Sequence, residues 1–195
     1  MLDKKYYQRA LSIAWPAVFE SFFIALAGII DTFMISGLGP SAVAAIGLTT
    51  QPKFLALTVF FAITSAVSAL VARRQGEDNR QKANQTLVTA LLISMIFVII
   101  VTVIMVMFAD PILKFAGSTE ETHTMAKEYF VIIILGTVFN AICWSINSAH
   151  RGAGNTRIAF ITNLVSSVVN IIFNYLLIKG HLGFPALGTK GAAIA

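Results

Sequence analysis

The chain has 195 residues, of which 57% are hydrophobic and only 12% are charged, and its mean hydropathy is +0.81. These values exclude an ordinary soluble domain and indicate an all-α integral membrane protein. The net charge of +5 does not point to a nucleic-acid partner, because in a membrane protein the placement of basic residues matters more than their sum.

Several apolar segments are long enough to cross a hydrocarbon core of about 30 Å, which requires roughly 20 residues of helix. We expect five complete spans, over residues 10–37, 44–72, 85–109, 126–149 and 157–178. The final residues, GAAIA, begin a sixth helix. The sequence therefore predicts a six-helix bundle in one domain over residues 1–195, with the sixth helix cut off soon after it begins.

The first predicted span carries two acids, Glu20 and Asp31, inside an apolar run. They lie eleven residues apart, which in a helix is three turns plus about 20°, so they share a face at a separation of roughly 16 Å. Carboxylates at membrane depth are costly and usually functional. Pro16 precedes Glu20, and Gly28 lies between Glu20 and Asp31, and the helix is expected to bend at these two positions.

The role of Glu20 has two interpretations. It is a second proton or substrate site, or it pairs with a basic residue near the cytoplasmic face. Lys53, in the second predicted span, is a candidate partner for Asp31, because both lie in the outer halves of their helices.

Polar side chains recur at helical spacing in the fourth and fifth predicted spans. The fourth span presents Asn140 and Asn147 on one side. The fifth carries a longer stripe: Asn163, Ser166, Ser167, Asn170 and Asn174. Such amides often only join helices, at about 0.6–2 kcal/mol per contact. For Asn140, Asn147 and Asn163 this structural role and a substrate or proton site both remain open.

Asp31 with Asn170 and Asn174 favours a functional interpretation. A carboxylate and two amide oxygens supply hard oxygen ligands for a small cation, or a titratable group with hydrogen-bond partners. We therefore expect an ion- or proton-binding site at these three residues.

Basic residues are concentrated in alternate connections between the predicted spans. Nine of them lie on one side of the membrane: Lys4, Lys5, Arg9, Arg73, Arg74, Arg80, Lys82, Arg151 and Arg157. The positive-inside rule places the N-terminus and these connections in the cytoplasm of a multi-pass plasma-membrane protein.

Motifs for ATP hydrolysis, paired cysteines and a zinc-binding HExxH are missing from the sequence. We expect neither an enzyme nor a bound cofactor or metal. Transport would then draw its energy from a sodium or proton gradient, which suits intramembrane carboxylates.

Four separated segments resemble the multidrug and toxin extrusion (MATE) family. They are WPAVFESFFIALAGIIDTFMISGLGPSAVAAIG, ARRQGEDNRQKANQ, HRGAGNTR, and NIIFNYLLI with the following PALGTKGAAIA. The resemblance implies an N-terminal half of a twelve-helix transporter, in which two six-helix bundles surround a cavity and cationic organic compounds leave in exchange for sodium or protons. It places the cation site on Asp31, Asn170 and Asn174.

Two departures from the family pattern affect these expectations. Some relatives carry an acid at the position of Asn174, so the coupling ion stays open between sodium and protons. The length corresponds to one bundle, so a complete cavity requires a second bundle or a second copy. The alternatives are an exporter of lipid-linked or polysaccharide substrates from the same superfamily, and a membrane fragment without transport activity.

Overall fold

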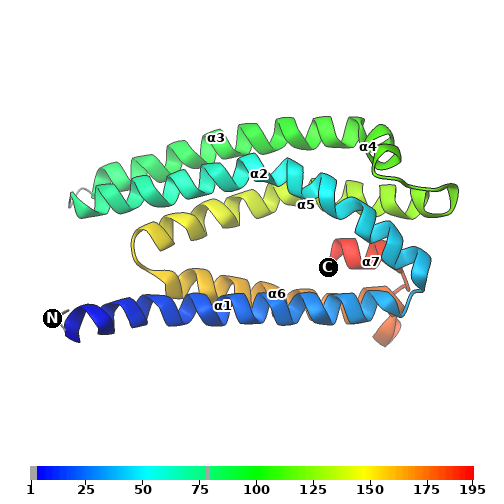
Figure 1. Ribbon diagram of the computed structural model, residues 1–195, viewed down its shortest axis with the longest axis horizontal. Helices are drawn as coiled ribbons and strands as arrows, with labels where there is room; N and C mark the ends of the chain where they lie inside the picture. Colours follow the sequence, from blue (N-terminus) through cyan, green and yellow to red (C-terminus); the bar gives the residue numbers. More distant parts are fainter. Residues whose placement is uncertain (1–3, 78–79) are drawn as a thin grey trace.

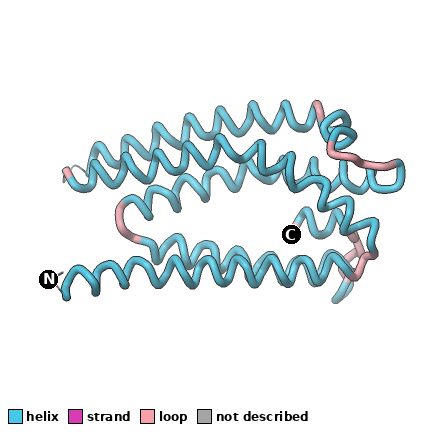
Figure 2. The backbone as a smooth tube through the Cα atoms, viewed as in Figure 1, coloured by secondary structure: helices cyan, strands magenta, loops and turns pink. Residues whose placement is uncertain are grey.

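The computed structural model describes residues 4–77 and 80–195, and these residues form long helices without a β-strand (Figures 1 and 2). The elements in chain order are α1 (Lys4–Ser36), α2 (Pro40–Gly76), α3 (Arg80–Met107), α4 (Ala109–Phe115), α5 (Glu120–Gly152), α6 (Thr156–Lys179), the 3₁₀ turn η1 (His181–Gly183) and α7 (Thr189–Ile194).

The predicted spans are confirmed, with longer helices than the apolar runs alone indicated. Among the described residues, five helical segments are long and apolar enough to cross a membrane: Ala14–Ser36, Pro40–Gly76, Gln81–Met107, Glu120–Gly152 and Thr156–Lys179. The sixth helix also begins, as α7. The sequence interpretation missed α4, which has only seven residues and is too short for a periodic pattern to stand out.

Local sequence signals explain where several helices begin and end. Pro40 opens α2 immediately after Gly39, whose φ of 104° suits a residue without a side chain. A capping box opens α5, in which the Thr119 N–H donates to Thr122 Oγ1 at 3.1 Å. Gly180, with a φ of 71°, ends α6 in the left-handed conformation.

The long helices separate into two packed groups. Helices α1 and α6 run side by side, whereas α2, α3 and α5 form the second group (Figure 1). The short α7 lies at one end, where it contacts both α5 and α6. Polar residues between the two groups therefore come from α1 and α6 on one side and from α2 and α5 on the other.

Close backbone contact fixes the crossing of α2 and α5. Gly152 lies against the carbonyl of Ser68, so closely that an added Cβ would collide with it. Nearby, Ser148 Oγ donates a hydrogen bond to the backbone oxygen of Thr64. Small residues at this crossing allow the two backbones to meet, as is common between membrane helices.

Candidate functional site

Asp31 meets both predicted asparagines of α6. Asn174 Nδ2 donates to Asp31 Oδ1 at 2.6 Å. Asn170 lies one turn earlier, and in the amide orientation that satisfies its hydrogen bonds its Nδ2 is 3.0 Å from Asp31 Oδ1 and 3.3 Å from Oδ2. The three residues predicted to form an ion or proton site are thus in direct contact.

The chemistry of this site fits a small cation or a proton. Asp31 is half-buried, and Asn174 is only 2% exposed. Asn174 Oδ1 is buried and has no hydrogen-bond partner among the described residues. The Asp31 carboxylate and the amide oxygens of the two asparagines are the hard oxygen ligands that small cations use, although it is the amide nitrogens that face Asp31 in this structure. Burying the Asn174 oxygen without a partner is costly.

Glu20 forms a second, different site on α1. Its Oε1 accepts from Arg151 Nη2 and from Asn163 Nδ2, each at 2.5 Å. The Glu20 side chain is 7% exposed, whereas that of Arg151 is 47% exposed. Of the two interpretations of Glu20, pairing with a basic residue is the one found in the structure.

At both carboxylate sites an asparagine of α6 donates a hydrogen bond to an acid of α1. Each acid accepts from an asparagine located 143 residues later, Glu20 from Asn163 and Asp31 from Asn174. The helices α1 and α6 therefore stay in register over three turns. The equal spacing of the acids and of the amides was a signal in the sequence that could have identified Asn163 as the partner of Glu20.

A cavity of about 580 Å³ adjoins Glu20, between the two helix groups. Asn147 lines it, is only 4% exposed, and has an Nδ2 without a hydrogen-bond partner in the described part of the chain. Asn140, in contrast, is exposed on α5 and is not among the cavity residues. The structure thus brings Asn147 to Glu20 and leaves Asn140 apart from both carboxylates.

The predicted pairing of Lys53 with Asp31 is wrong. Lys53 is half-buried and forms no ion pair with any described residue. The reason is the packing of α1, which lies mainly along α6 and has little contact with α2. Asp31 consequently finds its partners on α6.

Helix α1 is continuous through both residues at which bending is expected. Pro16 is buried inside the helix, and Gly28 has no atom of a neighbouring element near the place a Cβ would occupy. The space beside Gly28 is therefore open. Bending at Pro16 or Gly28 stays a prediction about another conformation.

Comparisons with known proteins agree on one family. The MatE family model matches residues 16–176. A probable multidrug resistance protein NorM of Thermotoga maritima is 28% identical over 95% of this chain and 40% of its own length. A FAD transporter of Shewanella oneidensis is 29% identical over 85% of this chain and 36% of its own length.

Solved structures share the fold. An outward-facing multidrug resistance MATE transporter of the MOP superfamily matches with a TM-score of 0.86 and 26% identity, over 95% of this chain and 40% of that one. A MOP superfamily transporter from Pyrococcus furiosus, described as having a binding pocket of reverse polarity that suggests a different function, matches with the same coverage, TM-score of 0.86 and 26% identity. The chain spans about 40% of the length of these relatives.

Proposed function

The chain belongs to the MatE family of multidrug transporters, and we propose that it forms the bundle in which Asp31 couples the entry of sodium or protons to the export of cationic organic compounds. The bundle comprises residues 1–195 and lies in the plasma membrane with its N-terminus in the cytoplasm. A second bundle or a second copy of the chain completes the substrate cavity.

The contact between Asp31 and Asn174 is the single observation that supports this proposal most strongly. It joins a half-buried carboxylate to an amide whose own oxygen is buried and unpartnered. A cation bound there would neutralise the Asp31 carboxylate, and a turn of the Asn174 amide, whose Nδ2 faces Asp31 in this structure, would bring its Oδ1 to the cation. A proton on Asp31 would neutralise the same charge, so the proposal covers sodium and protons alike.

Coupling follows from competition for one negative charge. When Asp31 is ionised it attracts an organic cation, and when an inorganic cation or a proton occupies it that attraction is lost. Export then requires that the two occupied states differ in which side of the membrane they face. Bending of α1 at Pro16 or Gly28 is the proposed means of changing between them.

Anionic cargo is the second candidate. Lys53 is a cation inside a predicted span without an ion pair among the described residues, and a headgroup phosphate or a carboxylate on the cargo would pair with it. The relative named as a FAD transporter and the reverse-polarity transporter from Pyrococcus furiosus are consistent with such variation. Lipid-linked and polysaccharide substrates belong to this alternative.

Dye efflux from cells that express the protein separates the two candidates. We expect efflux of a cationic dye such as ethidium, and its reduction to the level of cells without the protein in Asp31→Asn. Glu120→Gln is the matched control, because Glu120 is an exposed acid at the first residue of α5, and it should export normally. Export of an anionic dye that depends on Lys53 would instead support the alternative, and absence of any export would support the inert fragment.

A further inference from the structure

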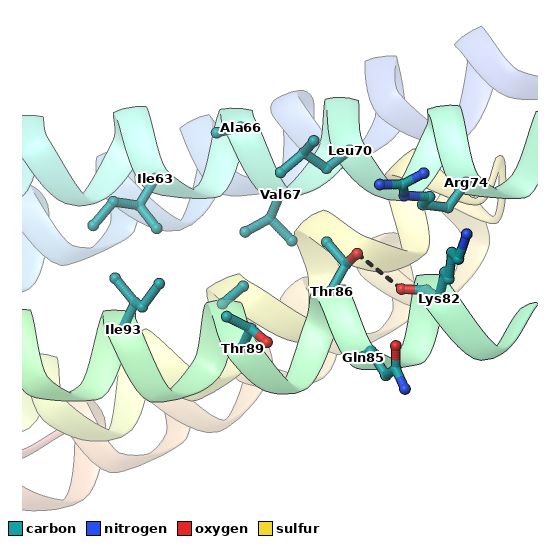
Figure 3. A pocket seen from close by; sticks show the side chains of 11 residues that line it. Ile63, Ala66, Val67, Leu70, Arg74, Lys82, Gln85, Thr86, Thr89 and Ile93 are labelled. Carbon is teal, nitrogen blue, oxygen red and sulfur yellow. Dashed lines mark hydrogen bonds between the residues drawn. The ribbon is translucent and has the colours of Figure 1, made fainter.

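A groove of about 510 Å³ runs between α2 and α3 (Figure 3), and neither Asp31 nor Glu20 lines it. Its lining changes in character along its length. Ile63, Leu70 and Ile93 form the apolar part, whereas Arg74 and Lys82 project at one end (Figure 3). The groove therefore has an apolar floor and a basic mouth.

The basic mouth lies where the two helices leave the membrane. Arg74 is in the last turn of α2, and Lys82 is in the first turns of α3. The apolar residues of the groove lie deeper in the same two spans. Leu70 is 47% exposed and Ile93 is 54% exposed, so this apolar surface faces lipid.

The charges at the mouth leave a positive excess. Residues 73–82 contain four basic and two acidic residues. Glu77 offsets part of this charge, because it accepts from Arg73 at 3.2 Å and from Arg74 at 2.9 Å. The hydrogen bonds from Arg74 and Arg73 hold the pKa of Glu77 below its ordinary value, so it is ionised at neutral pH. Four basic residues against two acidic ones leave this stretch with a net positive charge.

Hydrogen-bonding groups accompany the charges. Gln85 and Thr86 line the same end of the groove. Thr86 Oγ1 donates to the backbone oxygen of Lys82 at 2.8 Å, which ties this side chain to the first turns of α3. The Gln85 amide can donate to the oxygens of a phosphate ester bound beside the two cations.

We propose that this groove binds an anionic phospholipid, with the headgroup phosphate between Arg74 and Lys82 and one acyl chain along Leu70 and Ile93. The arrangement of charge above apolar surface fits a lipid and does not fit a free anion, which would leave the floor of the groove uncovered. With the orientation expected from the basic residues, the lipid comes from the cytoplasmic leaflet, where anionic lipids are enriched and basic pockets between helices bind them.

Titration of fluorescent phosphatidylglycerol into the purified, detergent-solubilised protein tests this proposal. We expect saturable binding that unlabelled phosphatidylglycerol displaces, and that phosphatidylcholine and inorganic phosphate do not. Each of Arg74→Gln and Lys82→Gln should weaken binding roughly fivefold, since a basic residue at a membrane surface contributes about that factor. Lys114→Gln, which removes an exposed cation outside the groove, should leave affinity unchanged.

A second variant tests the acyl chain separately. Ala66 lines the apolar part of the groove and is exposed, so Ala66→Phe should obstruct the chain and weaken binding while both cations remain. Unchanged thermal unfolding without added lipid would show that the variants still fold. Equal affinity for phosphatidylcholine, displacement by inorganic phosphate, or full affinity in the Arg74→Gln/Lys82→Gln double variant would overturn the proposal.

Discussion

Glu20 and Asp31 share a helix and the same kind of amide partner, but they differ in what neutralises them. Arg151 holds Glu20 in an ion pair, whereas no cationic side chain within the described residues pairs with Asp31. At Glu20 the neutralising positive charge is thus supplied by the Arg151 side chain. At Asp31 an exchangeable cation would supply it. We propose on this basis that Glu20 joins α1 to α5 and that Asp31 binds the coupling ion.

Removal of Arg151 should therefore destabilise the protein through Glu20. In Arg151→Gln, the buried carboxylate keeps only Asn163 as a donor, and we expect a loss of about 1–3 kcal/mol. In Glu20→Gln/Arg151→Gln both groups are neutral amides, so much of this stability should return. Thermal unfolding of the wild type, both single variants and the double variant measures the coupling.

Arg157→Gln provides the control. Arg157 is an exposed arginine near the start of α6, and it forms no ion pair with a described residue. It should unfold at the wild-type temperature. A double variant as unstable as Arg151→Gln would show that Glu20 is not the source of the effect.

The sequence predicted the carboxylates more readily than their partners. An acid in an apolar run is visible without a structure, and the register of the polar stripe pointed to Asn170 and Asn174. Arg151 was not identifiable as the partner of Glu20, because the two are separated by 131 residues and meet only in the folded bundle, where the Arg151 side chain reaches from α5 to α1. Lys53 was misassigned for the same reason, since a position along a helix does not reveal the neighbouring helix.

At the scale of the helices, the crossing of α2 and α5 depends on Gly152. Gly152→Ala would place a methyl group against the Ser68 carbonyl, and we expect a loss of about 1–3 kcal/mol in stability because both groups are backbone-fixed. Gly136→Ala on the same helix is the control, since nothing lies within 4 Å of its added Cβ. Unfolding temperatures of the two variants should differ clearly, and equal values would argue against the close crossing.

The corner between α4 and α5 is held by a small charged cluster. Asp110 Oδ1 interacts with His123 Nε2 at 3.0 Å, and Asp110 Oδ2 accepts from Lys127 Nζ at 2.6 Å. The hydrogen bonds from Lys127 and then from His123 lower the pKa of Asp110 below its ordinary value of 3.8. The ionised Asp110 carboxylate is consequently the form that stabilises the folded corner between α4 and α5.

This lowered pKa gives a pH dependence of defined sign. The contribution of Asp110 to stability is present above pH 3.8 and is lost as the pH falls through the lower pKa of the folded state. Asp110→Asn should therefore lower the unfolding temperature near neutral pH, and its difference from the wild type should shrink in acid. Glu120→Gln serves as the control, and a difference that stays constant with pH would contradict this account.

The helix α4 was not predicted because it is too short for its apolar residues to form a recognisable helical pattern. Ala109 and Leu113 are buried on one face, but a single pair of apolar positions cannot be distinguished from a loop in the sequence. The long spans were predictable because twenty apolar residues leave few alternatives in a membrane protein.

At the scale of the whole molecule, the bundle and its family were accessible from the sequence, and the arrangement of its helices was not. The pairing of α1 with α6, apart from α2, α3 and α5, follows from contacts between distant segments. This division places both carboxylates on one packed pair of helices and opens the cavity beside Glu20.

The role of Asp31 in coupling an ion gradient to export is tested most directly by efflux from proteoliposomes. A gradient of either sodium or protons is imposed, and efflux is measured for the wild type and for Asp31→Asn. We expect at least one of the two gradients to drive efflux of a cationic dye by the wild type. Asp31→Asn should insert normally, but neither gradient should drive efflux by this variant. Gradient-driven efflux by Asp31→Asn at the wild-type rate would contradict the assignment of Asp31 as the coupling site.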